Sequence, residues 1–209
     1  MKRKVFGIGF HKTGTTSLAE ALRHLGYRVT GPNEVTNPRI AEIAERLIYD
    51  LANQFDAFQD NPWPLFYREL DQAFPDSKFV LTIRPAEEWI ESIVNHARDI
   101  DTPMRTWIYG VGNPRGNEAV YMERYNRHNR DVKAYFRDRP KHLLVMQITA
   151  GEGWDKLCPF LEEPIPSIPF PRANTSAEVA RWRRRERSKL RRAYHAARTL
   201  FTNIAGERR

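Results

Sequence analysis

Apolar positions along the chain follow two periods that alternate with each other. Five short runs carry apolar or β-branched residues together or at every second position, which predicts strands over 5–8, 27–30, 55–60, 78–83 and 142–148. Between them, apolar residues recur every three or four positions, which predicts helices over 17–25, 38–51, 65–74 and 86–100. A polar, aromatic helix is expected over 118–137 and a short one within 151–163. Strands that alternate with helices predict a three-layer α/β/α fold around a parallel sheet.

Proline and glycine interrupt this alternation in two places. Residues 101–117 contain two prolines and three glycines, which indicates a long connection that could serve as a substrate loop or lid. Residues 164–174 are rich in proline and are expected to be irregular. After them, Thr175 or Ser176 caps a last, basic helix that runs to about Thr202. We therefore expect one domain over 1–209, in which 175–209 form a basic helical extension.

Composition and charge narrow the class of protein. With 41% hydrophobic and 29% charged residues, the 209-residue chain is expected to be globular rather than disordered. No apolar run approaches the roughly 20 residues that cross a bilayer, and the first residues do not resemble a signal peptide, which favours a cytoplasmic location. The single cysteine, Cys158, excludes an internal disulfide and is expected to be a buried thiol. The net charge of +8 fits a polyanionic ligand or partner.

The stretch from Gly9 to Thr16, G-F-H-K-T-G-T-T, joins the first strand to the first helix. Its glycine spacing is that of a phosphate-binding loop, in which backbone N–H groups and the helix N-terminus converge on an anion. The usual lysine position holds Thr15, and the lysine stands inside the loop as Lys12. A cation there can touch the oxygen between a leaving phosphate and a transferred group. The alternative is an ordinary strand–turn–helix connection without a ligand.

A later strand end offers a second phosphate site. Arg84 follows the strand 78–83, and Ser92 comes eight residues later, two turns into the next helix. The arginine fork and the serine hydroxyl can reach one phosphate. The alternative is a surface ion pair between Arg84 and Glu87 or Glu88.

Asp60 ends the strand 55–60 and is the candidate general base. Active groups gather at the carboxyl ends of parallel strands, and a carboxylate there can accept a proton. The alternative is an aspartate that satisfies the turn or caps the next helix. His96 and His11 are the other candidate bases, whereas His128 lies on the polar helix 118–137. No residue spacing in the chain indicates a metal site.

The string FHKTGTTSL resembles the 5′-phosphosulfate loop of cytosolic and Golgi sulfotransferases, which carry K-[ST]-G-T-T at the start of their first helix. Their donor is 3′-phosphoadenosine 5′-phosphosulfate (PAPS). The resemblance implies that Lys12 contacts the bridging oxygen and that the loop binds the 5′-phosphate through Thr13, Gly14, Thr15 and Thr16, with His11 and Ser17 in the same binding set. Many relatives have a tryptophan at the position of Ser17, where it stacks on adenine. The resemblance therefore does not identify which residue of this chain stacks on adenine.

The resemblance extends to the other strand ends. Arg84 and Ser92 match an arginine and a serine that hold the 3′-phosphate of PAPS in the family. Asp60, in the string QDNP, stands where steroid and phenol sulfotransferases have the histidine of T-H-x-P and where heparan-type relatives use a glutamate as base. Arg172 could reach the 3′ end of the nucleotide. Further strings, among them FYRELDQAFPDSKFVLTIRPAEEWIES, LLVMQITAGEGWDKLCPFLEEPIP and PFPRAN, match a less studied branch, so the likeness covers most of residues 5–175.

The implied function is metal-independent, in-line transfer of a sulfuryl group from PAPS to a hydroxyl or amine of an unknown acceptor. The acceptor pocket would be lined by four aromatic residues, Trp63, Phe66, Trp107 and Tyr109. Three alternatives remain: a Mg²⁺-dependent nucleotide kinase or NTPase with a degenerate loop, an inactive member of the family, and a non-enzymatic protein that binds nucleic acid or anionic lipid.

The last alternative depends on the basic segment from Arg181 to Arg192, RWRRRERSKLRR. We expect this segment to be a solvated helix or a contact with a second copy in a homodimer, and it could also contact an anionic membrane. PAPS and its product 3′-phosphoadenosine 5′-phosphate (PAP) are the expected partners, and nucleic acid is not.

Overall fold

The computed structural model describes residues 2–97 and 100–173. Backbone contacts divide the chain into one compact unit of residues 1–171 and a second of residues 172–209, of which only Arg172 and Ala173 are described. The account below concerns the first unit. The predicted basic helix and its segment 181–192 lie outside the described residues, so their form and partners stay predictions, as does the single domain over 1–209.

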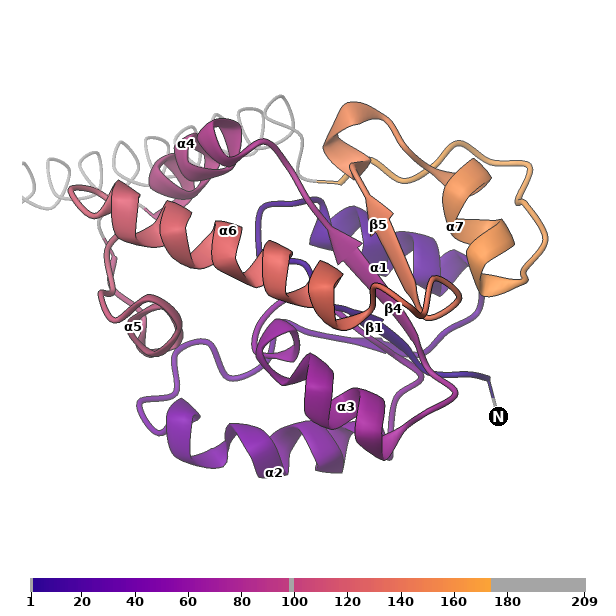
Figure 1. The fold of residues 1–209 in the computed structure, drawn as a ribbon, viewed down its shortest axis with the longest axis horizontal. Helices are drawn as coiled ribbons and strands as arrows, with labels where there is room; N and C mark the ends of the chain where they lie inside the picture. Colours follow the sequence, from indigo (N-terminus) through magenta and orange to yellow (C-terminus); the bar gives the residue numbers. More distant parts are fainter. Residues whose placement is uncertain (1, 98–99, 174–209) are drawn as a thin grey trace, which may run out of the picture. The chain divides into compact units, whose positions relative to one another are not determined.

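Five parallel strands form one sheet in the order β2-β3-β1-β4-β5. Figure 1 labels β1, β4 and β5. The central strand is β1 (Val5–Gly7), which lies between β3 (Ala57–Phe58) and β4 (Lys78–Thr82). The edges are β2 (Val29–Thr30) and β5 (Leu143–Met146). Each strand lies within one of the predicted runs, and the predicted parallel α/β sheet is confirmed.

Seven α-helices and two short 3₁₀ helices connect and follow these strands in the part of the chain that the structure describes. Their bounds are α1 (Thr15–His24), α2 (Ile40–Ala52), η1 (Trp63–Phe66), α3 (Tyr67–Ala73), α4 (Ala86–Ala97), α5 (Pro103–Tyr109), α6 (Glu118–Tyr135), η2 (Ile148–Ala150) and α7 (Trp154–Leu161). None of them combines the length and apolar character that a membrane span requires.

Alternation along the strands sends side chains to two separate cores. Val5 and Val80 face α1 and α7, together with the buried thiol of Cys158, whose pKa is raised by burial. Phe6 faces the other side, where its ring lies 4.8 Å from Phe58 and 5.3 Å from Phe79 between ring centroids. That face is covered by α2, η1, α3 and α6. The two covered faces give the predicted three layers.

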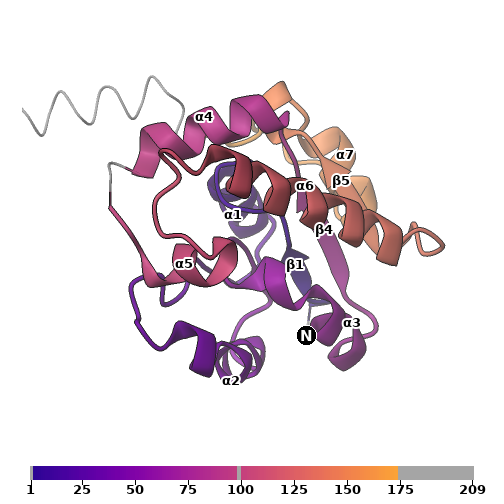
Figure 2. The same cartoon turned by 60° about the vertical axis from the view of Figure 1, so that its left-hand side comes forward.

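A third apolar cluster lies at the carboxyl ends of the strands, where α2, α4, α5 and α6 pack around Phe10 (Figure 2). Its helix α5 replaces part of the long connection predicted over 101–117. The helix begins because the Thr102 hydroxyl accepts a bond from the Arg105 N–H and Pro103 occupies the first turn, and it ends at Gly110 with φ +78°. This segment is therefore a packed helix, not an irregular loop over its whole length.

Candidate active site

Three neighbouring strands bring the predicted polar groups to one edge of the sheet. The loop after β1 carries Lys12, Asp60 follows β3 on one side, and Arg84 follows β4 on the other. Because β3, β1 and β4 are parallel, their carboxyl ends lie at the same edge. The helix α4, which carries Ser92, is tied to the loop because Trp89 Nε1 donates to the His11 carbonyl at 2.9 Å.

The loop between β1 and α1 has a tightly specified backbone. A Cβ at Gly9 would overlap the hydroxyl of Thr82 on β4, so only glycine fits there. Lys12 and Gly14 have φ of +67° and +101°, and a Cβ at Gly14 would come within 2.9 Å of the Ile148 side chain. At both glycines the backbone therefore lies too close to a neighbouring residue for a side chain to fit without a shift.

Thr13 stabilises the loop from within. Its completely buried hydroxyl donates to the Phe10 carbonyl at 2.6 Å and lies 2.6 Å from the Thr82 hydroxyl. Because the Thr13 side chain is used inside the loop, only its backbone can serve the phosphate contact that the resemblance implies.

The N-terminus of α1 follows the loop directly. Its cap residue, Gly14, has no side chain with which to satisfy the first N–H groups, and the first turn contains no acidic residue. The partial positive charge of the helix end is thus not neutralised by its own first turn. Thr16 is partly exposed at this end, whereas Ser17 is buried.

Asp60 is held by two hydrogen bonds and stays partly exposed. Its Oδ2 accepts from the Thr15 hydroxyl at 2.8 Å, and its Oδ1 accepts from the Asn61 N–H at 2.7 Å. Burial raises the pKa of Asp60, and these two bonds and the charge of Lys12 oppose that rise. The carboxylate therefore serves the turn, as the alternative interpretation expected, and is bonded to the loop through Thr15; its role as a base stays a prediction.

The histidines differ in their suitability as a base. His11 Nδ1 lies 2.7 Å from Asn61 Nδ2, and burial, with the charges of Arg105, His96 and Lys12, lowers the pKa of His11 to about 3. A neutral imidazole of that pKa is a weak proton acceptor. His96 is exposed near the end of α4.

His128 has a structural role. Its Nε2 donates to the Ile8 carbonyl at 2.8 Å, its ring stacks on Phe10 at 4.3 Å, and burial lowers its pKa to about 4. His128 lies on the buried face of α6, and its contacts with Ile8 and Phe10 therefore support the start of the loop.

The backbone of Arg84 is fixed by a residue that the sequence did not single out. The Tyr125 hydroxyl on α6 accepts from the Arg84 N–H and donates to the Arg84 carbonyl, both at 2.8 Å. Regular spacing of Tyr121, Tyr125, His128 and Val132 on the buried face of α6 is the signal that could have found it.

The Arg84 side chain forms an ion pair with Glu88, at 3.1 Å from Nε to Oε2. The predicted alternative of an ion pair is thus present, although a guanidinium has further N–H donors beyond Nε. Ser92 is partly buried, one helical turn beyond Glu88. Glu88 therefore lies between the two residues expected to hold a 3′-phosphate.

The four aromatic residues expected to line an acceptor pocket differ in their exposure. Trp63 is wrong as a pocket residue, because it is completely buried against Phe58 and its Nε1 donates to Asn33. Tyr109 is buried and stacks on Tyr121 at 3.8 Å. Phe66 and Trp107 are partly exposed and lie 6.1 Å apart between ring centroids.

Arg172 is exposed and belongs to the second unit, so its reach toward a nucleotide stays a prediction.

Comparisons with known proteins bear on this site. A family model described as a sulfotransferase domain matches residues 4–114 and 104–179. Ava biosynthesis cluster protein M of Aspergillus versicolor is 26% identical over 213 residues, which cover 83% of this chain and 81% of that protein. The family match includes the loop, Asp60, Arg84 and Ser92, and it confirms the resemblance seen in the sequence. The chain belongs to the sulfotransferase domain family.

Proposed function

We propose that this chain transfers a sulfuryl group from PAPS to a hydroxyl or amine of an acceptor. The observation that carries the proposal is the strand order β3-β1-β4, which brings Asp60, the Lys12 loop and Arg84 to one edge of the sheet. One nucleotide with a phosphate at each end needs two separate anion sites on one edge. The uncapped start of α1 and the Arg84–Ser92 pair are suited to be these two sites.

In this proposal the chain contributes orientation, charge and a proton acceptor. Lys12 and the backbone of the loop stabilise the charge that grows on the leaving phosphate. Arg84 and Ser92 bind the 3′-phosphate and fix the direction of the donor. Asp60 accepts the proton of the acceptor group. The bond from sulfur to the bridging oxygen breaks, the bond from sulfur to the acceptor forms, and PAP leaves with the electron pair of the broken bond.

The position of Thr15 favours this function over a Mg²⁺-dependent kinase. Thr15 occupies the lysine position of an ATPase loop, so the lysine that such a loop extends to the β- and γ-phosphates is absent from that position.

Calorimetry with PAP, AMP and ATP, each with and without Mg²⁺, tests the proposal. We expect PAP to bind at least about tenfold more tightly than AMP without metal, because the second phosphate adds charge-assisted hydrogen bonds. Arg84→Ala should bring PAP down to the affinity of AMP. Glu88→Gln is the matched variant: it removes the competing carboxylate and should keep or increase PAP affinity. Tighter binding of Mg²⁺–ATP than of PAP would overturn the proposal.

A further inference from the structure

Arg124, on α6, is a partly buried arginine that covers the ring of Phe10. Its guanidinium carbon lies 5.2 Å from the ring centroid, and it forms no ion pair with a carboxylate of residues 2–97 or 100–173. Burial lowers the pKa of Arg124, and the charge of Arg127 acts in the same direction. Arg127, one turn further along α6, is exposed and pairs with Glu123 at 3.7 Å. Charged groups taken out of water normally have a charged partner, so the missing one at Arg124 calls for an explanation.

Buried polar atoms without a hydrogen-bond partner lie in the same neighbourhood. They are His11 Nε2, Asn61 Oδ1 and Tyr109 Oη. Asn61 and Tyr109 are 4% and 5% exposed, so bulk water does not account for their hydrogen bonding. The three residues come from the loop, the end of β3 and α5, which meet at this edge of the sheet.

Contacts link these atoms to Arg124. His11 Nδ1 lies 2.7 Å from Asn61 Nδ2, and the His11 ring meets the Tyr109 ring edge-on at 6.0 Å. Tyr109 in turn packs on Phe10, also at 6.0 Å, and Phe10 is the ring that Arg124 covers. Asn61 also donates its N–H to the Asp60 carboxylate at 2.7 Å, so this chain of contacts joins the arginine to the candidate base.

We propose that Arg124 binds an anionic group of the acceptor, with Tyr109 as its polar neighbour. The inference rests on the proposed function and names the substrate class: an acceptor that carries a carboxylate or similar anion as well as the hydroxyl or amine that receives the sulfuryl group. The donor's phosphates already have their sites at the loop and at Arg84. Arg124 is linked instead through Phe10 and Tyr109 to the surroundings of Asp60, which accepts the acceptor's proton in the proposed function. Its unpaired charge and the unsatisfied phenol match an anion with several acceptor lone pairs.

Arg105 on α5 adds positive charge to the anion site that we propose at Arg124. Its guanidinium donates to the backbone carbonyls of Ile100 and Gly112, and it has no carboxylate partner among the described residues. These bonds fix the connection around α5, and they leave the positive charge of Arg105 without a negatively charged partner among the described residues. Its charge also helps to lower the pKa of His11. An acceptor with a positive tail should therefore be rejected.

Three phenols of matched shape test the proposal: 3-(4-hydroxyphenyl)propanoate, 4-propylphenol and tyramine, whose tails are anionic, neutral and cationic. Each is titrated by calorimetry into protein saturated with PAP. We expect the carboxylate to bind at least about tenfold more tightly than the neutral phenol, the size of one charge-assisted hydrogen bond, and tyramine to bind most weakly. Aromatic probes suit the partly exposed rings of Phe66 and Trp107 beside the site.

Variants separate anion binding from simple packing on Phe10. Arg124→Met keeps much of the side chain's apolar bulk and should abolish the preference for the carboxylate, while Arg124→Lys should retain part of it. Arg127→Met, the matched control on the same helix, should leave it unchanged. PAP affinity should be the same in all three variants, which distinguishes failure here from failure of the proposed function.

Any other order of the three phenols would overturn the assignment, and so would the absence of measurable binding by all three. A carboxylate preference that survives in Arg124→Met would do the same. In that case Arg124 acts only as a cation–π contact on Phe10.

Discussion

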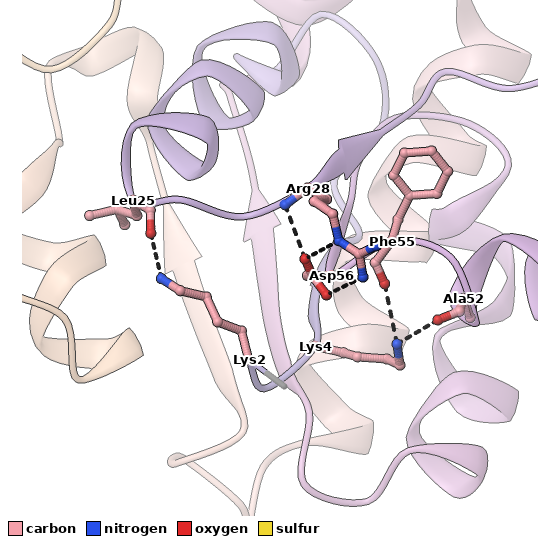
Figure 3. Close-up of polar contacts among 7 residues, drawn as sticks. All are labelled: Lys2, Lys4, Leu25, Arg28, Ala52, Phe55 and Asp56. Atoms are coloured by element: carbon pink, nitrogen blue, oxygen red, sulfur yellow. Dashed lines mark hydrogen bonds and ion pairs between the residues drawn. The ribbon is translucent and has the colours of Figure 1, made fainter.

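The two ends of the sheet use positive charge in different ways. At the amino ends of the strands, Lys2 donates to the Leu25 carbonyl, and Lys4 donates to the carbonyls of Ala52 and Phe55 (Figure 3). Lys2 also donates to Glu163. Arg28 forms a two-point ion pair with Asp56, at 2.9 and 3.0 Å. Each of these cations is bonded to oxygen atoms of the protein itself and joins segments that are distant in sequence.

At the carboxyl ends, positive charge is less fully compensated. Arg124 has no carboxylate partner among the described residues, and one buried polar atom each of His11, Asn61 and Tyr109 lacks a hydrogen bond. Unsatisfied groups of this kind cost folding free energy, and a ligand that supplies the missing partners would recover part of that cost. The comparison shows that basic residues at the amino end stabilise the fold, and it supports our proposal that those at the carboxyl end bind ligands.

The largest expected effect comes from removing the charge in the loop. Lys12→Ala should lower the rate of sulfuryl transfer by about 10²–10³-fold, because the charge on the leaving phosphate loses its cation. Lys12 has a φ of +67°, which alanine tolerates no better than lysine, so Lys12→Asn serves as a second variant because asparagine adopts this conformation more readily. Lys2→Ala, at the amino end, should leave the rate unchanged. Near-normal rates of transfer by both Lys12 variants would contradict the division between the two ends of the sheet.

A second prediction concerns His128, which supports the loop and is not expected to bind ligand, and the pH dependence of the stability that it provides. His128 has a pKa of about 4 in the folded chain, below its ordinary value of 6.5, because burial disfavours its charged form. The unfolded chain therefore takes up the proton first as the pH falls. Stability from His128 is fully present above about pH 6.5 and is lost progressively toward pH 4, by roughly 3 kcal/mol in all.

Chemical denaturation between pH 7 and pH 4 measures this loss. His128→Gln, which can still donate to the Ile8 carbonyl, should make the free energy of unfolding less dependent on pH, while PAP affinity at neutral pH stays close to normal. His24→Gln changes an exposed histidine on α1 and is the control. An unchanged pH dependence in His128→Gln would show that another group, such as His11, titrates instead.

The third prediction concerns the acid side of the activity profile. The Thr15 hydroxyl donates to the Asp60 carboxylate, and this bond lowers the pKa of Asp60 against the effect of burial. Thr15→Val removes the bond, so the Asp60 pKa should rise and activity should fall off at a higher pH than in the unmodified protein. The measurement is kcat/KM against pH with a fixed acceptor. If activity in Thr15→Val falls off at the same acid pH as in the unmodified protein, Asp60 is not the base.

Much of this arrangement could be predicted from the sequence, because its local signals agree with the fold. Apolar periods marked the strands, and the glycine-rich loop and Arg84 stood at strand ends that a parallel sheet brings to one edge. The ion pair between Arg84 and Glu88 was foreseen as one of two alternatives, because Glu87 and Glu88 are close to Arg84 in sequence.

The remainder depends on contacts between residues that are distant in sequence. Tyr125 binds the backbone of Arg84, 41 residues away, and no local pattern specifies that partner. Trp63 was expected in a pocket. The turn after β3 instead places it in the core on one face of the sheet, where it packs against Phe58 and Phe6. Arg124 is one of several arginines on a polar helix, and only its place over Phe10 distinguishes it from Arg127.

The smallest expected effect is at the amino end. Lys4 Nζ lies 2.5 Å from the Ala52 carbonyl and 3.2 Å from the Phe55 carbonyl, so it neutralises the C-terminal end of α2. Lys4→Met keeps the apolar stem and removes the donor, which should cost about 1 kcal/mol of stability, or a fall of about 2–4 °C in Tm. PAP affinity and the order of the three phenols should not change. Weaker nucleotide binding by Lys4→Met, at unchanged fold, would mean that charge at the amino end also serves the ligand, and the division between the two ends would fail.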